Sequence, residues 1–222
     1  MINTSGRGKR KLKAGVDIPT PDEIRNIIHT ANGKHRPLLL TAIFTGLRGS
    51  ELRGLRWQDV DLKKSELHVR QRADRYNSIG KPKSESGDRT VPLGPLVLNA
   101  LRGWRLACTK GTRDLVFPNG RGNIESHANI VKRIWWPAQI KAGVVDDKGE
   151  AKYSGLHATR HFYASWCINR KQDGGLELPI KTVQSSLGHA SIMLTSDVYG
   201  HLFPRTDDGS ELAEAEKFLM TV

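Results

Sequence analysis

Apolar residues recur at helical spacing along most of the chain, and they alternate with polar residues in only one stretch. The first helix has a clear start at Thr20-Pro21-Asp22-Glu23, where threonine can cap, proline suits the first helical position and Glu23 can return the capping-box bond. This pattern predicts a helix that runs to about Ala31. The same spacing predicts further helices at about 37–45, 48–55, 94–107, 126–141, 157–170, 179–187, 191–198 and 209–220.

The alternating stretch lies between about Glu66 and Leu93, where glycines and serines interrupt short runs of apolar and polar residues. It predicts a three-stranded antiparallel sheet whose last turn falls near residues 84–87, with residues 89–92 returning. Lys83 would then lie at a hairpin tip, where its side chain can reach outward. The expected fold class is therefore α+β, mainly helical, with a small three-stranded antiparallel sheet.

The 222 residues are enough to bury a core, and the apolar runs are spread between residues 36 and 200 without a long linker. One compact domain over residues 17–206 is the expected arrangement. Residues 1–16 carry basic residues among glycines, which predicts a flexible linker that is either solvated or in contact with an anion. Residues 207–222 are expected to form a tail helix, because Asp208-Gly209-Ser210-Glu211 offers a capping box ahead of an apolar stripe.

The net charge of +12 favours an anionic partner, with nucleic acid the first candidate and an anionic membrane surface the second. The membrane is disfavoured because the sequence has neither an amphipathic basic helix nor a long apolar stretch, and its polar N-terminus lacks the apolar region of a signal peptide. A soluble, cytoplasmic protein is expected. Cys108 and Cys167 lack metal-ligand spacing, so we expect two small buried apolar residues in a reducing compartment.

Three polar side chains are expected on one face of the helix that begins at His157, because His157, Arg160 and His161 follow the i, i+3, i+4 spacing. A zinc site of the two histidines would need a glutamate after the first, but Ala158 stands there and no third ligand is implied. The set is either reactive, or structural with His157 capping the helix and Arg160 paired with a carboxylate.

Arg48 follows the glycine turn at Thr45-Gly46 and begins a predicted helix, whose free N–H groups favour an anion. Glu51, three residues on, could fix its guanidinium. Arg53 and Arg56 are expected to be solvated or to track phosphates, since a basic protein has many such charges.

His189 and Tyr199 complete a candidate group, since one helix between them can fold the two side chains back into one pocket. A lone tyrosine is usually a half-buried packing residue. The sequence shows no acidic metal cluster, Walker loop or nucleotide fingerprint, so arginine, lysine and histidine alone would meet the charge on a reacting phosphate. The set suits phosphoryl transfer to a tyrosine, which means cutting and rejoining a nucleic-acid backbone.

Taken in order, these residues resemble the tyrosine recombinase (phage integrase) family over roughly residues 18–205. The family pattern is an Arg-x-x-Glu box, a hairpin lysine, a His-x-x-Arg-His box, then Leu-Gly-His and tyrosine. The matching positions are Arg48 with Glu51, Lys83, His157, Arg160, His161, Leu187-Gly188-His189 and Tyr199-Gly200-His201-Leu202. Each box alone is a weak signal, but the set in this order and spacing is highly specific. Ala158 and Thr159 replace commoner residues, which concerns local packing rather than chemistry.

The resemblance implies that residues 17–206 are a catalytic domain, and the chain looks like a fragment because family members usually carry an upstream core-binding domain. Tyr199 would attack a DNA phosphodiester and leave a 3′-phosphotyrosine, with no cofactor and no metal. The implied roles of the other residues are as follows: Arg48 and Arg160 clamp the non-bridging oxygens, His189 donates a further bond, Lys83 protonates the leaving 5′-oxygen, His157 accepts or relays the tyrosine proton, and Glu51 and His161 support them.

The implied partners are double-stranded recombination sites, further protomers that form a tetramer in the synapse from free monomers, and accessory DNA-bending or directionality proteins. The resemblance also implies a protein of a phage or mobile element, and the expected location is cytoplasmic and nucleoid-associated. The tail helix would dock on its own domain or on a neighbouring protomer. Two other functions compete: a type IB topoisomerase-like enzyme that relaxes DNA, and a DNA-binding module that has lost catalysis. A membrane-surface protein is a more distant third.

Overall fold

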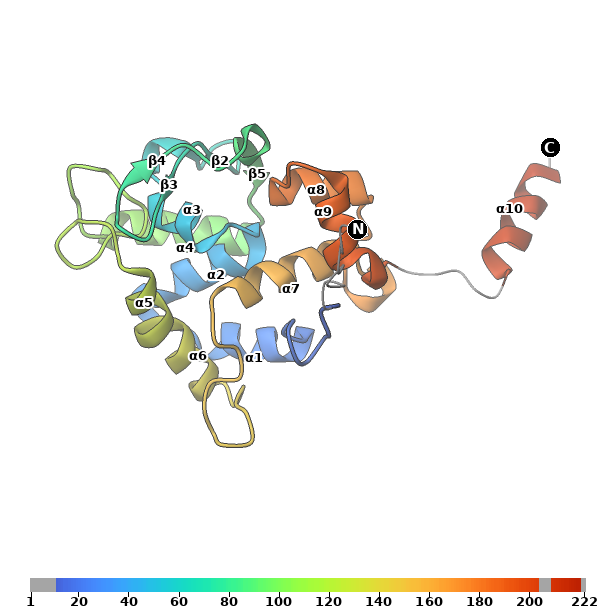
Figure 1. Ribbon diagram of the computed structural model, residues 1–222, viewed down its shortest axis with the longest axis horizontal. Helices are drawn as coiled ribbons and strands as arrows, with labels where there is room; N and C mark the ends of the chain where they lie inside the picture. Colours follow the sequence, from blue (N-terminus) through green and yellow to red (C-terminus); the bar gives the residue numbers. More distant parts are fainter. Residues whose placement is uncertain (1–10, 204–208, 221–222) are drawn as a thin grey trace, which may run out of the picture.

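The computed structural model describes residues 11–203 and 209–220, so the first ten residues of the predicted linker lie outside the described part of the chain. The fold is helical with a small sheet on one side, as the sequence predicts (Figure 1). The helices are α1 (Pro21–Thr30), α2 (Arg36–Thr45), α3 (Gly49–Gly54), α4 (Pro95–Ala107), α5 (His127–Ile130), α6 (Trp136–Lys141), α7 (His157–Ile168), α8 (Ile180–Leu187), α9 (Ile192–Tyr199) and α10 (Ser210–Met220).

The predicted start of α1 is confirmed. The Glu23 amide donates to Thr20 Oγ1 at 3.2 Å, and the Thr20 amide donates back to Glu23 Oε2 at 2.8 Å. The Glu23 carboxylate also accepts bonds from Lys152 Nζ and from the Tyr153 hydroxyl, both at 2.6 Å. The capping residue therefore also ties α1 to the segment that leads into α7.

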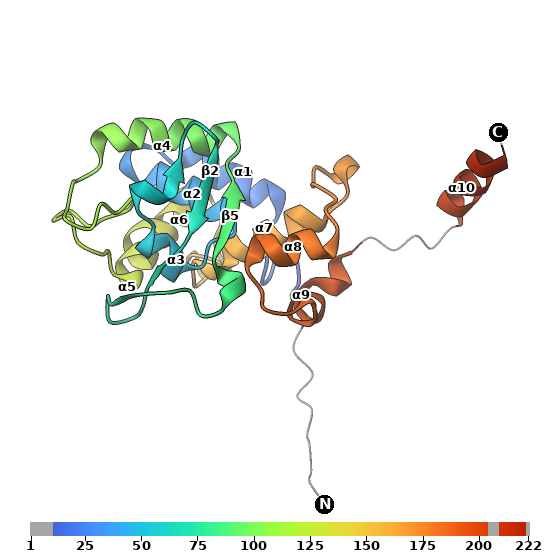
Figure 2. The same ribbon diagram turned by 90° about the horizontal axis from the view of Figure 1, so that it is seen from above.

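The core is centred on α2, where every residue except Arg36 and Phe44 is buried. A helix that is apolar on all sides needs neighbours all round. It packs against α4 on one side and α7 on another, with the sheet above them (Figures 1 and 2). A smaller apolar cluster between α7, α8 and α9 contains Cys167, Leu187 and Tyr199. Cys167 is buried as expected, whereas Cys108 is only half-buried.

The three-stranded antiparallel sheet is confirmed, with the order β1 (Val60–Asp61), β2 (Glu66–Val69) and β5 (Arg89–Pro92). Its first strand precedes the stretch in which we expected it. A separate antiparallel ribbon pairs β3 (Arg72–Ala73) with β4 (Ile79–Gly80).

The predicted hairpin tip at Lys83 is wrong in its strand pairing. The strand before Lys83 turns back on β3, through a turn in which Asn77 has a left-handed φ of 63°. The strand after it, β5, pairs with β2. Lys83 therefore lies in an exposed connection between two ladders, just before the short helical turn Glu85–Gly87.

The helix predicted over 126–141 is divided by a π-helical stretch, Val131–Trp135. Pro137 lies just after it and has no N–H for the carbonyl four residues earlier, against which its ring also clashes. Widening the turn relieves this conflict.

The tail helix α10 lies apart from the remaining helices in both views (Figures 1 and 2). Four of its large apolar side chains are exposed: Leu212, Phe218, Leu219 and Met220. Within residues 11–203 and 209–220, no helix is long and apolar enough to span a bilayer.

Candidate active site

Three arginines from other segments bind the C-terminal end of α8. The helix ends at Gly188, which has a left-handed φ of 62°. The last carbonyls of a helix lack partners within it and lie at the negative end of its dipole. Here they are satisfied by guanidinium groups: Arg89 Nε donates to Ser186 O at 2.8 Å, Arg160 Nη2 to Leu187 O at 2.6 Å and Arg48 Nη2 to Gly188 O at 3.2 Å.

Arg48 lies at the N-terminal end of α3, as predicted, and Glu51 fixes it. The Arg48 amide donates to Glu51 Oε2 at 2.9 Å, and Arg48 Nη1 donates to Glu51 Oε1 at 2.7 Å. Glu51 is buried and also accepts a bond from Arg89 Nη2 at 3.0 Å. Burial alone raises the pKa of this carboxyl. Arg89 and Arg48 lower the pKa by a larger amount, so it lies below its ordinary value.

Arg89 is a site residue that the sequence reasoning missed, because it was taken only as part of the returning strand. The alternation of inward-facing and outward-facing residues along the strand could have identified it. Arg89 stands two residues before Val91, which is buried, and the two share a face of β5. An arginine on the inward face of a strand needs partners, and here Glu51 and the end of α8 supply them.

Arg160 is almost fully buried on α7 and bridges two segments. Its Nη1 donates to Gly46 O at 2.5 Å, while Nη2 reaches α8. Gly46 has a φ of 62°, and a Cβ there would clash with the Tyr163 ring. Burial, followed by the charge of Arg48, lowers the pKa of Arg160 to about 9. The guanidinium remains protonated at neutral pH.

Tyr199 is the last residue of α9 and is 2% exposed. Its hydroxyl lies 2.8 Å from His161 Nδ1, and its ring stacks on that of His189 with 6.4 Å between centroids. Burial raises the pKa of Tyr199 to about 12, although Arg160 and Arg48 oppose the shift. A phenol in this state needs a base before it can attack.

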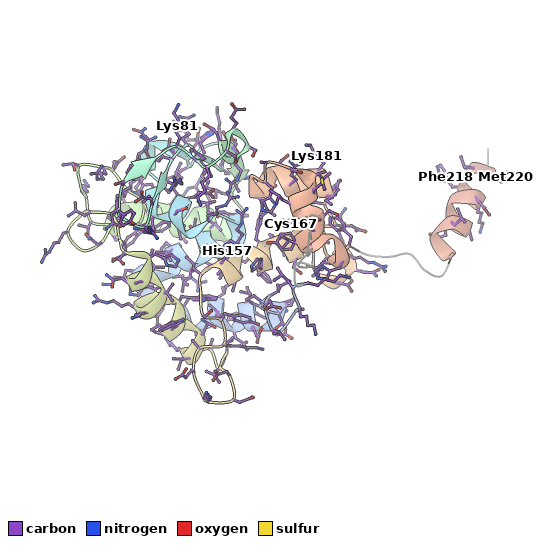
Figure 3. All side chains as sticks on the ribbon, in the orientation of Figure 1. Lys81, His157, Cys167, Lys181, Phe218 and Met220 are labelled. Carbon is purple, nitrogen blue, oxygen red and sulfur yellow. The ribbon has the colours of Figure 1, made fainter. Side chains whose placement is uncertain are left out.

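Three histidines form a group with Tyr199. His161 touches it, and the His157 ring meets the His161 ring edge-on at 4.6 Å (Figure 3 places His157 at the start of α7). His157 is exposed at the surface, whereas His161 and His189 are half-buried. Desolvation by the surrounding residues, followed by nearby charges that include Arg160, lowers the pKa of each of the three to about 4. All three are therefore neutral at pH 7 and able to accept a proton. The sequence reasoning gave His157 the contact that the structure gives to His161.

His189 is oriented by its own neighbours. Its Nδ1 lies 2.9 Å from the Thr195 hydroxyl, and Gln184 Nε2 donates to its carbonyl at 2.9 Å. If Thr195 donates to Nδ1, the proton of the neutral ring is on Nε2, where it can be offered to an anion.

The segment before α1 reaches the same site. Leu12 O accepts a bond from His201 Nε2 at 2.7 Å, just beyond the tyrosine. A cavity of about 270 Å³ beside this contact is lined by Leu12 and Asp17 together with His157 and His161.

Lys83 is not among the residues brought together. It is exposed, and it makes no hydrogen bond or ion pair within the described part of the chain. Its neighbour Lys81 lies on the sheet side of the molecule, away from His157 (Figure 3).

The prediction that Arg53 would be solvated or track phosphates is wrong. Arg53 is 3% exposed, and its guanidinium is used entirely within the protein. Arg56 is half-buried and pairs with Asp59, with Nε donating at 2.7 Å.

All of the candidate catalytic residues, from Arg48 to Tyr199, lie within one match to a known family. The profile of the Phage integrase family matches residues 19–205. A tyrosine recombinase XerC-like protein of Caldanaerobacter subterraneus is 28% identical over 225 residues, covering 90% of this chain and 54% of that protein. A tyrosine recombinase XerC of Xylella fastidiosa is 35% identical over 169 residues, covering 76% of this chain and 49% of that protein. The chain thus spans about half the length of these relatives.

The fold is also similar to that of the Tn1549 transposon integrase solved in complex with circular intermediate DNA. The TM-score is 0.72 at 21% identity, covering 93% of this chain and 68% of that one. This likeness supports the fold described above.

Proposed function

Because the chain belongs to the phage integrase family, we propose that it is a site-specific recombinase that cleaves and rejoins DNA strands through Tyr199. The observation that carries the proposal is the Tyr199 hydroxyl in contact with a neutral histidine beside two arginines. The phenolic oxygen attacks phosphorus, and the bond to the 5′-oxygen breaks. A 5′-hydroxyl of a partner strand then attacks the 3′-phosphotyrosine and releases the tyrosine.

The arginines would meet the charge of the transition state. In the free protein Arg48 and Arg160 donate to carbonyls at the end of α8, which keeps both guanidinium groups near each other and fixed in direction. Non-bridging phosphate oxygens accept stronger, charge-assisted bonds than carbonyls do. We expect His189 Nε2 to supply a further donor as charge builds up.

Proton transfer would involve residues on both sides of the phosphate. His161, with His157 behind it, accepts the proton of Tyr199. Lys83 protonates the leaving 5′-oxygen when its connection closes on bound DNA. This assigns the tyrosine proton to His161 first, with His157 as a relay.

The proposal extends to the arrangement of the chain. Residues 17–206 form the catalytic domain, the basic segment 1–16 follows phosphates, and the tail 207–222 docks on a neighbouring protomer. The partners are double-stranded recombination sites and further protomers, with a tetramer in the synapse and a monomer when free. Binding of accessory DNA-bending or directionality proteins belongs to the same proposal.

A covalent trap tests the activity without a known site. The chain is incubated with a pool of random-sequence duplexes nicked near the centre, so that the short cleaved strand diffuses away. We expect a protein–DNA adduct that survives denaturant, with peptide mapping placing the nucleotide on Tyr199. A topoisomerase-like enzyme would relax supercoils without joining strands of two duplexes, whereas a silent DNA-binding module would form no adduct.

A further inference from the structure

The connection that carries Lys83 is held at both of its ends by the short helix α3. Upstream, Arg53 fixes the β3–β4 ribbon. Its Nη1 donates to Asp74 O at 3.1 Å, its Nη2 donates to Asn77 Oδ1, and its Nε donates to Glu125 O at 2.6 Å. The proposed chemistry makes no use of this buried guanidinium.

The backbones of α3 and β3 also approach closely. A Cβ at Gly54 would lie 2.9 Å from both Ala73 N and Arg72 Cα. Gln71 Nε2 donates to Gly54 O at 2.7 Å. The ribbon is thus fixed to the helix by backbone packing as well as by the Arg53 side chain.

The turn that Arg53 holds is itself well defined. Asp74 Oδ1 accepts bonds from the amides of Tyr76 at 2.8 Å and Ser78 at 3.0 Å. Asn77 takes its left-handed conformation here and turns its side chain back to Arg53. A displacement at Asn77 would therefore be passed to β4 and to the residues that follow it.

Downstream, the connection is held by the other end of the same helix. Arg89 Nη1 donates to Gly87 O at 3.1 Å and Nη2 donates to Glu51 at 3.0 Å. A Cβ at Gly87 would meet Pro82 at 2.5 Å, so the two ends of the loop around Lys83 are in contact. The helix α3, which follows Arg48, thus sets where both ends of this loop lie.

We propose that Arg53 is a positioning residue that, through Asn77 and the β3–β4 ribbon, places Lys83 relative to the phosphate held by Arg48. The inference rests on the proposed function, because it assigns Arg53 to the general-acid half of that reaction. A purely structural role would instead lower stability and slow every substrate alike.

The first measurement uses the free protein. In Asn77→Gly the acceptor for Arg53 is removed while glycine keeps the positive φ without strain. Ser65→Gly is the matched control, because Ser65 also has a positive φ, of 57°, in the turn between β1 and β2 of the neighbouring sheet. Amide hydrogen exchange over residues 72–88 should be about tenfold faster in Asn77→Gly and unchanged in Ser65→Gly. Unchanged exchange in Asn77→Gly would overturn the anchoring.

The second measurement follows cleavage of nicked duplexes selected from the random pool, made with either oxygen or sulfur at the 5′-bridging position. A departing alkoxide needs the proton of Lys83, whereas a departing thiolate needs none. Asn77→Gly and Arg53→Lys should cleave the oxygen substrate about 10- to 100-fold more slowly than the wild type. On the sulfur substrate the loss should be within about twofold. Equal slowing on both substrates would show that Arg53 acts on stability or phosphate binding instead.

Lys83→Ala separates the two possible failures. If sulfur restores Lys83→Ala but not Asn77→Gly, the general acid is correct and the positioning inference is wrong. If sulfur restores neither, the general-acid assignment falls and the positioning inference falls with it. A wild-type chain that forms no adduct would overturn the proposed function, while the exchange measurement would still decide whether Arg53 anchors the ribbon.

Discussion

At the scale of single residues, the site depends on polar side chains that the protein removes from water. Tyr199→Phe should abolish the covalent adduct while leaving non-covalent DNA affinity nearly intact. The loss of one buried hydroxyl and its bond to His161 should lower the free energy of unfolding by about 1 kcal/mol. Tyr76→Phe is the control, since Tyr76 is 72% exposed. An adduct in Tyr199→Phe that survives denaturant would assign the nucleophile elsewhere.

Arg160→Lys keeps the charge but loses the planar fork that reaches Gly46 and Leu187 at once. Single-turnover cleavage should fall by about 100- to 1000-fold, because a fixed donor to the transition state is lost. Arg105→Lys provides the comparison, since Arg105 lies over the Trp57 ring at a distance from the site. Normal cleavage by Arg160→Lys would exclude the clamp.

The three histidines of the site make stability depend on pH. Each has a folded-state pKa of about 4, below its ordinary value of 6.5. The unfolded chain therefore binds more protons between these values, and the free energy of unfolding should fall as the pH is lowered from 6.5 towards 4. Urea unfolding at several pH values measures the slope. His161→Asn should flatten it, and an unchanged slope would contradict the lowered pKa of His161.

At the scale of elements, the C-terminal end of α8 accepts hydrogen bonds from Arg48, Arg89 and Arg160. Gly188→Ala should be destabilising by about 1–3 kcal/mol, since alanine pays for the positive φ. Its Cβ would also lie 2.8 Å from Arg89 Nη1. Gly143→Ala carries the same conformational cost, at a φ of 70°, but meets nothing within 4 Å. The Cβ added at Gly188 would also lie 2.9 Å from Ser86 O, so the difference between the two variants in thermal unfolding measures the contacts with Arg89 and Ser86 together. Equal losses would show that these contacts are immaterial.

The tail helix offers a separate prediction. An isolated helix of this length is marginal in water, and its apolar side chains need a receiving surface. Replacing Leu212 and Phe218 with glutamate should leave thermal unfolding of the free protein unchanged and impair multimer assembly on DNA in native gels. Glu214→Gln is the control on the same helix. A lowered melting temperature with normal assembly would instead indicate docking on its own domain.

The sequence predicts elements better than it predicts their partners. Helical periodicity and the capping box at Thr20 depend on neighbouring residues, so the bounds of α1 and α7 follow from local chemistry. The division of the strands into a sheet and a ribbon depends on which distant strand each one pairs with. Arg53 and Arg89 are found inside for the same reason, because their acceptors are supplied by segments far away in the chain. The motif residues are recognisable by order and spacing, but their mutual contacts are not.

At the scale of the whole molecule, the net charge of +12 should make DNA binding steeply dependent on salt. Replacing Arg7, Lys9 and Arg10 with glutamine should reduce the slope of log affinity against log salt by up to about three, if each contacts a phosphate. The same replacement at Lys63, Lys64 and Lys148 keeps the net charge equal and serves as the control. Identical slopes in wild type and the N-terminal variant would mean that the basic segment stays in solvent.

The bond from His201 to Leu12 joins the segment ahead of α1 to the residues just after Tyr199, the proposed nucleophile. The two therefore share one thermodynamic cycle. If binding at the segment ahead of α1 favours breaking the bond between Leu12 and His201, the same free energy changes the preferred position of Tyr199. The converse must also hold. When Tyr199 is joined to DNA, the affinity of the domain for the segment around Leu12 changes by the same factor. A change at Tyr199 would therefore be detectable as a change in how the segment around Leu12 is bound.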